Sequence, residues 1–220
     1  MLRFDAVLFD LDGTLVDSAP DLAGAANHLR VVRGLSPRPY AELRPMVGAG
    51  ARGMLAAAFG IGPGDEDYEA MRDEFLACYS QRLLQETAVF LNMQPVLEYL
   101  NAMPLTWGIV TNKVLRFAEP LVAGVTLLSR AAVLIAGDST PYAKPHPEPL
   151  LEAARRLGVS PARCLYVGDD HRDIVAGRAA GMATLAAGWG YLGQGAPIDV
   201  WGADGVISEP LELLQWLQVA

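Results

Sequence analysis

Short apolar runs alternate with helical patterns along this chain, and that alternation is the strongest constraint on its fold. Each run is almost wholly apolar and is bounded by polar or turn residues. Such alternation predicts βαβ units and a parallel sheet, and continuous apolar strands fit a sheet covered on both faces. We therefore expect an α/β fold with a Rossmann-like parallel sheet flanked by helices. The expected strands are 6–9, 106–110, 133–136, 164–167, 184–187 and 205–207.

The stretch between the first two expected strands is much longer than one crossover requires. It has almost no strand pattern and reads as helices over 20–33, 40–59, 67–85 and 95–101. Because one crossover needs only one helix, most of this stretch is expected to be an inserted α-helical subdomain, residues 17–87. Residues 1–16 and 88–220 would then form the α/β core.

Composition narrows the classes of protein that the chain can be. It has 220 residues, is 52% apolar and carries a net charge of −8. A nucleic-acid or anionic-membrane binder needs a basic face, so neither partner is expected. Only two of the seventeen basic residues are lysines, Lys113 and Lys144.

The cysteines and the hydropathy pattern indicate a cytoplasmic protein. Cys78 and Cys164 lie far apart in apolar stretches, so we expect buried thiols and no disulfide or CxxC metal site. No stretch of 18 apolar residues is present, which argues against a membrane span.

Acidic side chains follow two of the expected strands at the point where each ends. Asp10 and Asp12 follow the first, and Asp169, Asp170 and Asp173 follow the fourth. Ligands of open parallel sheets bind at the carboxyl ends of the strands. A solvated turn with an Asp cap explains the first pair alone, and helix capping explains one acid of the second group. Together the five acids can form an oxygen-rich site for Mg²⁺.

A site that handles phosphate also needs positive charge, because five acids would repel a phosphate ester. Lys144 is the candidate, since Pro145 restrains the backbone that carries it. Thr111 and Asn112 offer polar groups at the end of the second strand, although either could be an ordinary loop residue. Lys113 is expected at the rim or in solvent.

Four motifs in this order resemble those of the haloacid dehalogenase superfamily. They are Asp-x-Asp-Gly-Thr from Asp10, Thr111-Asn112, Lys144-Pro145 and Gly-Asp-Asp-x-x-Asp ending at Asp173. The helical insertion after the first motif is similar to the cap of the superfamily's phosphoglycolate phosphatase-like branch. The resemblance covers essentially the whole chain.

The resemblance implies roles for the first motif and for the metal ligands. Asp10 would be the nucleophile that forms an aspartyl-phosphate, and it would also bind Mg²⁺. Asp12 would be the general acid and then the general base, with its backbone carbonyl on the metal. Asp169 would be the main further ligand, with Asp170 and Asp173 in supporting roles.

The same resemblance implies how the phosphoryl group is held. Thr111 and Asn112, with the amides around Asp12 and Gly13, would bind its oxygens, and Lys144 would neutralise charge between nucleophile and phosphate. The expected activity is Mg²⁺-dependent hydrolysis of a small phosphate monoester.

Substrate choice is expected to lie in the inserted helices, since the core motifs touch only phosphate and metal. Gly50 permits close backbone approach and Arg52 could reach an anionic group, although a surface arginine at a helix start explains the same residues. The resemblance to the phosphoglycolate phosphatase-like branch implies 2-phosphoglycolate or N-acetylmuramic acid 6-phosphate as the substrate. A phosphomutase and a non-catalytic metabolite-binding regulator remain as alternatives. The sequence leaves open whether the protein is a monomer or a homodimer.

Overall fold

The computed structural model describes residues 3–218, so the ends of the expected core, 1–2 and 219–220, lie outside the described residues. Its centre is a six-stranded parallel sheet in the order β5-β4-β1-β6-β7-β8. The α/β fold expected from the sequence is confirmed, with every expected strand found within one residue of its expected bounds. The strands are β1 Ala6–Phe9, β4 Thr106–Val110, β5 Leu134–Ile135, β6 Cys164–Gly168, β7 Ala183–Ala187 and β8 Gly205–Ile207.

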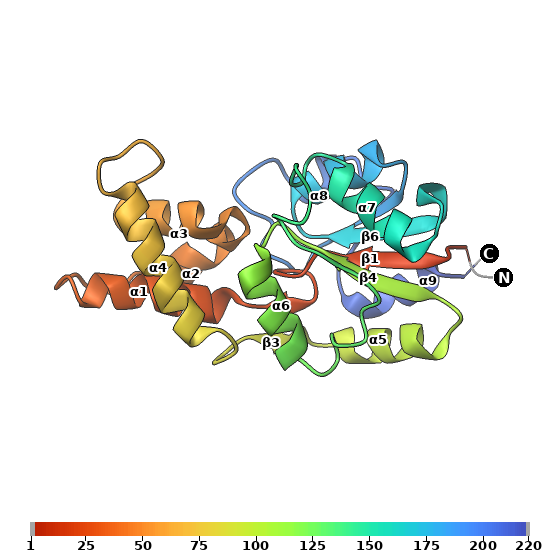
Figure 1. Cartoon of the computed structure of the whole chain (residues 1–220), viewed down its shortest axis with the longest axis horizontal. Helices are drawn as coiled ribbons and strands as arrows, with labels where there is room; N and C mark the ends of the chain where they lie inside the picture. The colour runs from red at the N-terminus through yellow and green to blue at the C-terminus, as the bar shows by residue number, and fades with distance from the viewer. Residues whose placement is uncertain (1–2, 219–220) are drawn as a thin grey trace.

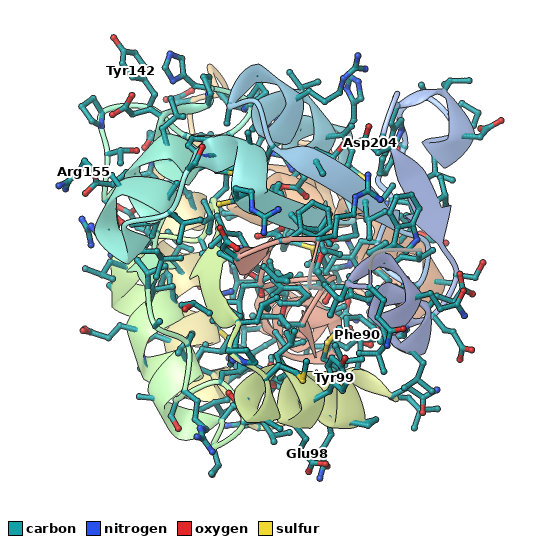
Figure 2. The ribbon with its side chains drawn as sticks, turned by 90° about the vertical axis from the view of Figure 1, so that its right-hand side faces the viewer. Phe90, Glu98, Tyr99, Tyr142, Arg155 and Asp204 are labelled. Carbon is teal, nitrogen blue, oxygen red and sulfur yellow. The ribbon has the colours of Figure 1, made fainter. Side chains whose placement is uncertain are left out.

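Helices cover both faces of this sheet. Alternate side chains of β1 enter different apolar clusters, Val7 and Phe9 on one face and Ala6 and Leu8 on the other. In Figure 1, α7 and α8 lie above the sheet and α5 below it. Seen from the right-hand end of that view, Glu98 on α5 projects outward at the bottom of the core and Arg155 on α7 projects outward at its left (Figure 2). The core helices are α5 Met93–Ala102, α6 Leu115–Gly124, α7 Glu148–Leu157, α8 His171–Ala179 and α9 Leu213–Trp216, with short 3-10 turns at Pro161–Arg163, Ile198–Val200 and Pro210–Glu212.

The helices of residues 17–87, which we call the cap, pack around an apolar cluster of their own. Leu29, Met54 and Phe75 are fully buried in it, and two core side chains, Phe117 and Tyr191, join it. Figure 1 shows these helices gathered at the left, beyond the end of the sheet. They are α1 Ala19–Val31, α2 Tyr40–Leu43, a 3-10 helix Arg44–Ala49, α3 Gly50–Phe59 and α4 Tyr68–Arg82.

The single helix expected over 40–59 is wrong, because the chain breaks there into three pieces. Pro45 has no N–H for a continuing helix, and Gly50 adopts a positive φ of 62°. The segment around Gly48 consequently turns toward the core.

The sequence pattern also missed a short antiparallel ribbon at the two crossings between cap and core. β2 Val16–Asp17 pairs with β3 Ala88–Val89. The buried carboxylate of Asp21 accepts hydrogen bonds from the backbone N–H groups of Glu86 and Thr87, at 2.9–3.1 Å. These bonds hold the outgoing and returning chain side by side.

The two cysteines differ in exposure. Cys164 is buried as expected, whereas Cys78 is only partly buried. Within residues 3–218, every helix is too short or too polar to cross a bilayer.

Candidate functional site

The carboxyl ends of β1, β4 and β6 lie side by side and face the cap across a cavity of about 350 Å³. The chain leaves β1 for β4 and β5 on one side and then returns to β6 on the other, which makes this edge the sheet's topological switch point. Most residues proposed from the sequence line the cavity: Asp10, Asp12, Gly50, Thr111, Asn112, Lys144, Asp169, Asp170 and Asp173. Gly13 and Arg52 are not among the lining residues.

Three acids converge at the floor of the cavity. Oxygens of Asp10, Asp169 and Asp173 all lie within 4.8 Å of one another. Burial raises the pKa of Asp10 to about 6, although the charge of Lys144 opposes the rise. Burial, and then the negative charges of Asp10 and Asp173, raise the pKa of Asp169 well above its usual range. Such a group of buried carboxylates is electrostatically unfavourable without a nearby cation.

Asp169 is held in place by two hydrogen bonds and by two glycines that pack closely against its side chain. It accepts hydrogen bonds from the Thr14 hydroxyl and the Tyr191 backbone N–H, each at 2.8 Å. A Cβ atom at Gly13 or at Gly190 would lie 2.1 Å from an atom of Asp169, so both positions require glycine. Gly13 therefore leaves space for the Asp169 carboxylate and does not line the cavity.

Lys144 joins two of the three acids. Its buried ammonium group lies 2.9 Å from Asp10 Oδ1 and 2.7 Å from Asp173 Oδ1, and it donates to the Tyr166 hydroxyl at 2.8 Å. Burial opposes the charge of Lys144, but Asp10 and Asp173 outweigh it and raise the pKa of the ammonium group. Lys144 is consequently a fixed positive charge beside Asp10.

Two side chains from the end of β4 support this arrangement. Asn112 exchanges two hydrogen bonds of 2.9 Å with the backbone of Lys144, donating to its C=O and accepting from its N–H. The Asn112 side chain thus positions Lys144, a contact that the sequence did not predict. Thr111 is buried, and its hydroxyl accepts a hydrogen bond from the Lys113 N–H at 3.1 Å.

The expectation that Lys113 lies at the rim or in solvent is wrong. Its Nζ lies 3.1 Å from both carboxylate oxygens of Asp12, and its side chain is only 8% exposed. Asp12 also accepts a hydrogen bond from the Ser18 hydroxyl. Burial opposes the charge of Lys113, but Asp12 raises its pKa. The spacing of Lys113 two residues after Thr111, at the same strand end, is the signal that could have identified it.

Asp170 lies apart from the other acids of its motif. It caps α8 by accepting from the Arg172 N–H at 2.8 Å and also binds the Arg172 guanidinium. Although burial opposes the shift, Arg172 lowers the pKa of Asp170. The convergent group contains Asp10, Asp169 and Asp173. The Asp170 side chain instead caps the N-terminus of α8 and binds Arg172.

Two arginines, one from the core and one from the cap, form hydrogen bonds between the two parts. Arg172 of the core donates a hydrogen bond to the Gly48 carbonyl, and Arg44 of the cap donates to the Gly190 carbonyl at 3.1 Å. Arg44 also lies over the Tyr191 ring, 5.0 Å from its centroid. Arg52, which was expected at the substrate, is exposed on α3.

Comparison with known proteins agrees with this geometry. A family model described as haloacid dehalogenase-like hydrolase matches residues 4–181. The chain is 40% identical over 219 residues to an N-acetylmuramic acid 6-phosphate phosphatase of Pseudomonas aeruginosa, covering 100% of this chain and 97% of the relative. It is 46% identical over 214 residues to a phosphoglycolate phosphatase of Xanthomonas campestris, covering 96% of each chain.

A solved structure with similar architecture extends the comparison to three dimensions. The crystal structure of a predicted phosphoglycolate phosphatase from Haemophilus somnus superimposes with a TM-score of 0.86 at 27% identity, covering 98% of each chain. The sheet, the acids at its switch point and these matches along nearly the whole length lead to one conclusion. The chain belongs to the haloacid dehalogenase-like hydrolase family, and it is a phosphatase of that family.

Proposed function

We propose that the protein is a Mg²⁺-dependent phosphatase that hydrolyses a small phosphate monoester by transferring the phosphoryl group to Asp10. The observation that carries the proposal is the convergence of Asp10, Asp169 and Asp173 beside Lys144. Phosphoryl transfer depends mainly on positioning and on neutralising the phosphoryl oxygens, and this constellation supplies both.

The acid group fits a magnesium ion by its charge and by its donor atoms. When all three carboxylates are ionised, they face one ammonium group, which leaves two negative charges in a buried site. Magnesium prefers oxygen ligands and carries the matching charge, so Asp10, Asp169 and Asp173 would hold it, with the Asp12 backbone carbonyl as the resemblance implies. When bound, Mg²⁺ would polarise the phosphoryl group and neutralise its charge.

The reaction would proceed in two steps, transfer of the phosphoryl group to Asp10 and hydrolysis of the aspartyl-phosphate. An Asp10 carboxylate oxygen bonds to phosphorus while the ester P–O bond breaks, and Asp12 gives its proton to the departing alkoxide. Asp12 then takes a proton from water, which bonds to the phosphorus of the aspartyl-phosphate and releases inorganic phosphate and Asp10. Asp12 is held for this exchange by Ser18 and Lys113.

Lys144 would supply positive charge of the chain's own at the phosphoryl oxygens. Its ammonium group donates a hydrogen bond to the Tyr166 hydroxyl and Asn112 holds its backbone, so little reorganisation is required when the phosphate arrives. Thr111, at the end of β4, would donate from its hydroxyl to the same oxygens.

The proposed substrate is 2-phosphoglycolate or N-acetylmuramic acid 6-phosphate, as the names of the relatives suggest. A cavity of about 350 Å³ is large enough to enclose a small ligand. We also propose a cytoplasmic protein, a monomer or homodimer without nucleic-acid or membrane partners, for which the net charge of −8 is the support. The division into a core of 1–16 and 88–220 and a cap of 17–87 is proposed as well, supported by the ribbon of β2 and β3 at its crossings.

The proposal is tested with wild type and Asp10→Asn on a set of phosphate esters that includes both candidate substrates. Phosphate release should require Mg²⁺, stop in EDTA and be lost in Asp10→Asn. With ³²P-labelled substrate, rapid acid quenching should leave protein-bound label that hydroxylamine releases. Transfer of the phosphoryl group to another hydroxyl of the sugar, without phosphate release, would instead establish the phosphomutase alternative.

A further inference from the structure

The cavity contains one cation whose charge no acid among residues 3–218 compensates. Four cationic side chains line it: Lys113, Arg116, Lys144 and Arg172. Three of them are paired, Lys113 with Asp12, Lys144 with Asp10 and Asp173, and Arg172 with Asp170. Arg116 is exposed and lines the cavity; within the described part of the chain it makes no ion pair and no side-chain hydrogen bond, and its guanidinium carbon lies 4.7 Å from the centre of the Phe117 ring.

Arg116 is placed by the same strand end that carries the phosphate-binding residues. It lies in the first turn of α6, three residues after Lys113. Figure 1 shows α6 between the core sheet and cap helix α4. Its neighbour Phe117 is buried in the cap's apolar cluster and packs against Tyr79 of α4, with ring centroids 5.4 Å apart. The backbone that carries Arg116 is therefore anchored against both parts of the molecule.

A second polar group in the cavity also lacks a hydrogen-bond partner. Tyr79 is 1% exposed and lines the cavity, and its ring centre lies 4.8 Å from the ammonium nitrogen of Lys113; within residues 3–218 its hydroxyl has no hydrogen-bond partner. A buried hydroxyl is unfavourable unless a bound molecule satisfies it. Arg116 and Tyr79 both contact the Phe117 ring, so a guanidinium donor and a hydroxyl donor both line the cavity around this residue.

We propose that Arg116 binds a carboxylate of the substrate that is remote from the phosphate, with the Tyr79 hydroxyl as a second donor in the same cavity. The proposal rests on the proposed function and deepens it by naming the substrate class: phosphate esters that carry a second, singly charged anionic group. A guanidinium matches a carboxylate with two parallel hydrogen bonds. One uncompensated positive charge suits a monoanion better than a second phosphate. This assignment places in the core the substrate arginine that the sequence placed at Arg52.

The test compares two sugar phosphates that differ in one carboxylate. N-acetylmuramic acid 6-phosphate carries a lactyl carboxylate that N-acetylglucosamine 6-phosphate lacks, and 2-phosphoglycolate and ethyl phosphate form a smaller pair. The quantity measured is the ratio of kcat/KM between the members of each pair. Arg116→Gln should lower the ratio about 10- to 100-fold, mainly through KM for the carboxylate member, because a charge-assisted hydrogen-bonded pair is lost.

Matched variants make the result specific. Arg116→Lys keeps the charge without the planar fork and should recover part of the ratio, and Tyr79→Phe should lower it less than Arg116→Gln. Arg130→Gln removes an exposed arginine outside the cavity lining and is the control for net charge. Arg52→Gln should lower the ratio less than Arg116→Gln.

Three results would overturn the proposal. If Arg116→Gln lowered kcat/KM equally for both members of a pair, Arg116 would not bind the carboxylate. A larger loss on glucose 1,6-bisphosphate than on the carboxylate substrates would assign Arg116 to a second phosphate. If wild type released phosphate from no ester in the presence of Mg²⁺, both the proposed function and this inference would be refuted. If wild type were active but Arg116→Gln left the ratio of kcat/KM unchanged, only this inference would be refuted.

Discussion

Replacing the proposed nucleophile should make the metal-free protein more stable while it removes activity. Burial disfavours the ionised form of Asp10 in the folded protein and thereby raises its pKa from 3.8 to about 6. One pKa unit corresponds to about 1.4 kcal/mol, so the full shift corresponds to about 3 kcal/mol of destabilisation when Asp10 is ionised. The Asp10 side chain is 13% exposed to the cavity, and solvent there reduces the expected effect to about 1–3 kcal/mol.

The pH dependence follows from the direction of the shift. The folded protein retains the Asp10 proton up to about pH 6, whereas the unfolded chain releases it near 3.8. Wild-type stability in EDTA therefore falls as pH rises between these values and then levels off. The asparagine side chain of the variant does not titrate, so the gain from Asp10→Asn should be near zero at about pH 4 and complete at about pH 7.5.

The assay is urea unfolding of wild type and Asp10→Asn in EDTA at several pH values. A gain of about 1–3 kcal/mol corresponds to a rise of roughly 2–12 °C in melting temperature for a chain of this length. Saturating Mg²⁺ should shrink or reverse the gap, because ligand binding stabilises only the wild type strongly. Asp199→Asn, an exposed site outside the cavity lining, controls for net charge. An Asp10→Asn protein that is less stable in EDTA at neutral pH would show that attraction to Lys144 outweighs burial.

Three further predictions concern the metal, the lysine support and the thiols. Asp169→Asn should abolish the rise in melting temperature that Mg²⁺ produces in wild type, measured by differential scanning fluorimetry, and an undiminished rise would place the metal elsewhere. Tyr166→Phe removes a buried hydroxyl that accepts from Lys144 and should cost about 1–3 kcal/mol in urea unfolding, whereas an unchanged midpoint would contradict the assigned bond. Iodoacetamide should modify Cys78 before Cys164, since Cys164 is buried and burial raises its pKa to about 11; mass spectrometry of native protein gives the order, and the reverse order would refute it.

The strands and the acids at their ends could be predicted from local sequence because each depends on short-range pattern. A run such as 164–167 predicts a buried strand by itself, and polar residues after it must lie at the sheet's carboxyl edge. This reasoning predicts that Asp10 and Asp169 lie together, and in the structure their carboxylate oxygens lie within 4.8 Å of each other. The break at Pro45 was equally local but was overlooked within a longer helical pattern.

The partners of polar side chains within the site could not be predicted in this way. Lys113 follows one motif and Lys144 belongs to another, yet only the packed structure shows that Lys113 lies against Asp12 and Lys144 between Asp10 and Asp173. Similarly, Arg52 and Arg116 each follow a plausible anion-binding segment and both are exposed, but the packing of cap against core makes only Arg116 a lining residue of the cavity.

Sequence alone thus determined the α/β sheet, the inserted helices, the family and the acids of the site. Tertiary structure decided which cations neutralise those acids and which one remains for a ligand. The physical reason is range. Strand and helix patterns depend on neighbours a few residues apart, whereas the 3.1 Å pair between Lys113 and Asp12 joins residues 101 positions apart and forms only when β1 and β4 pack side by side.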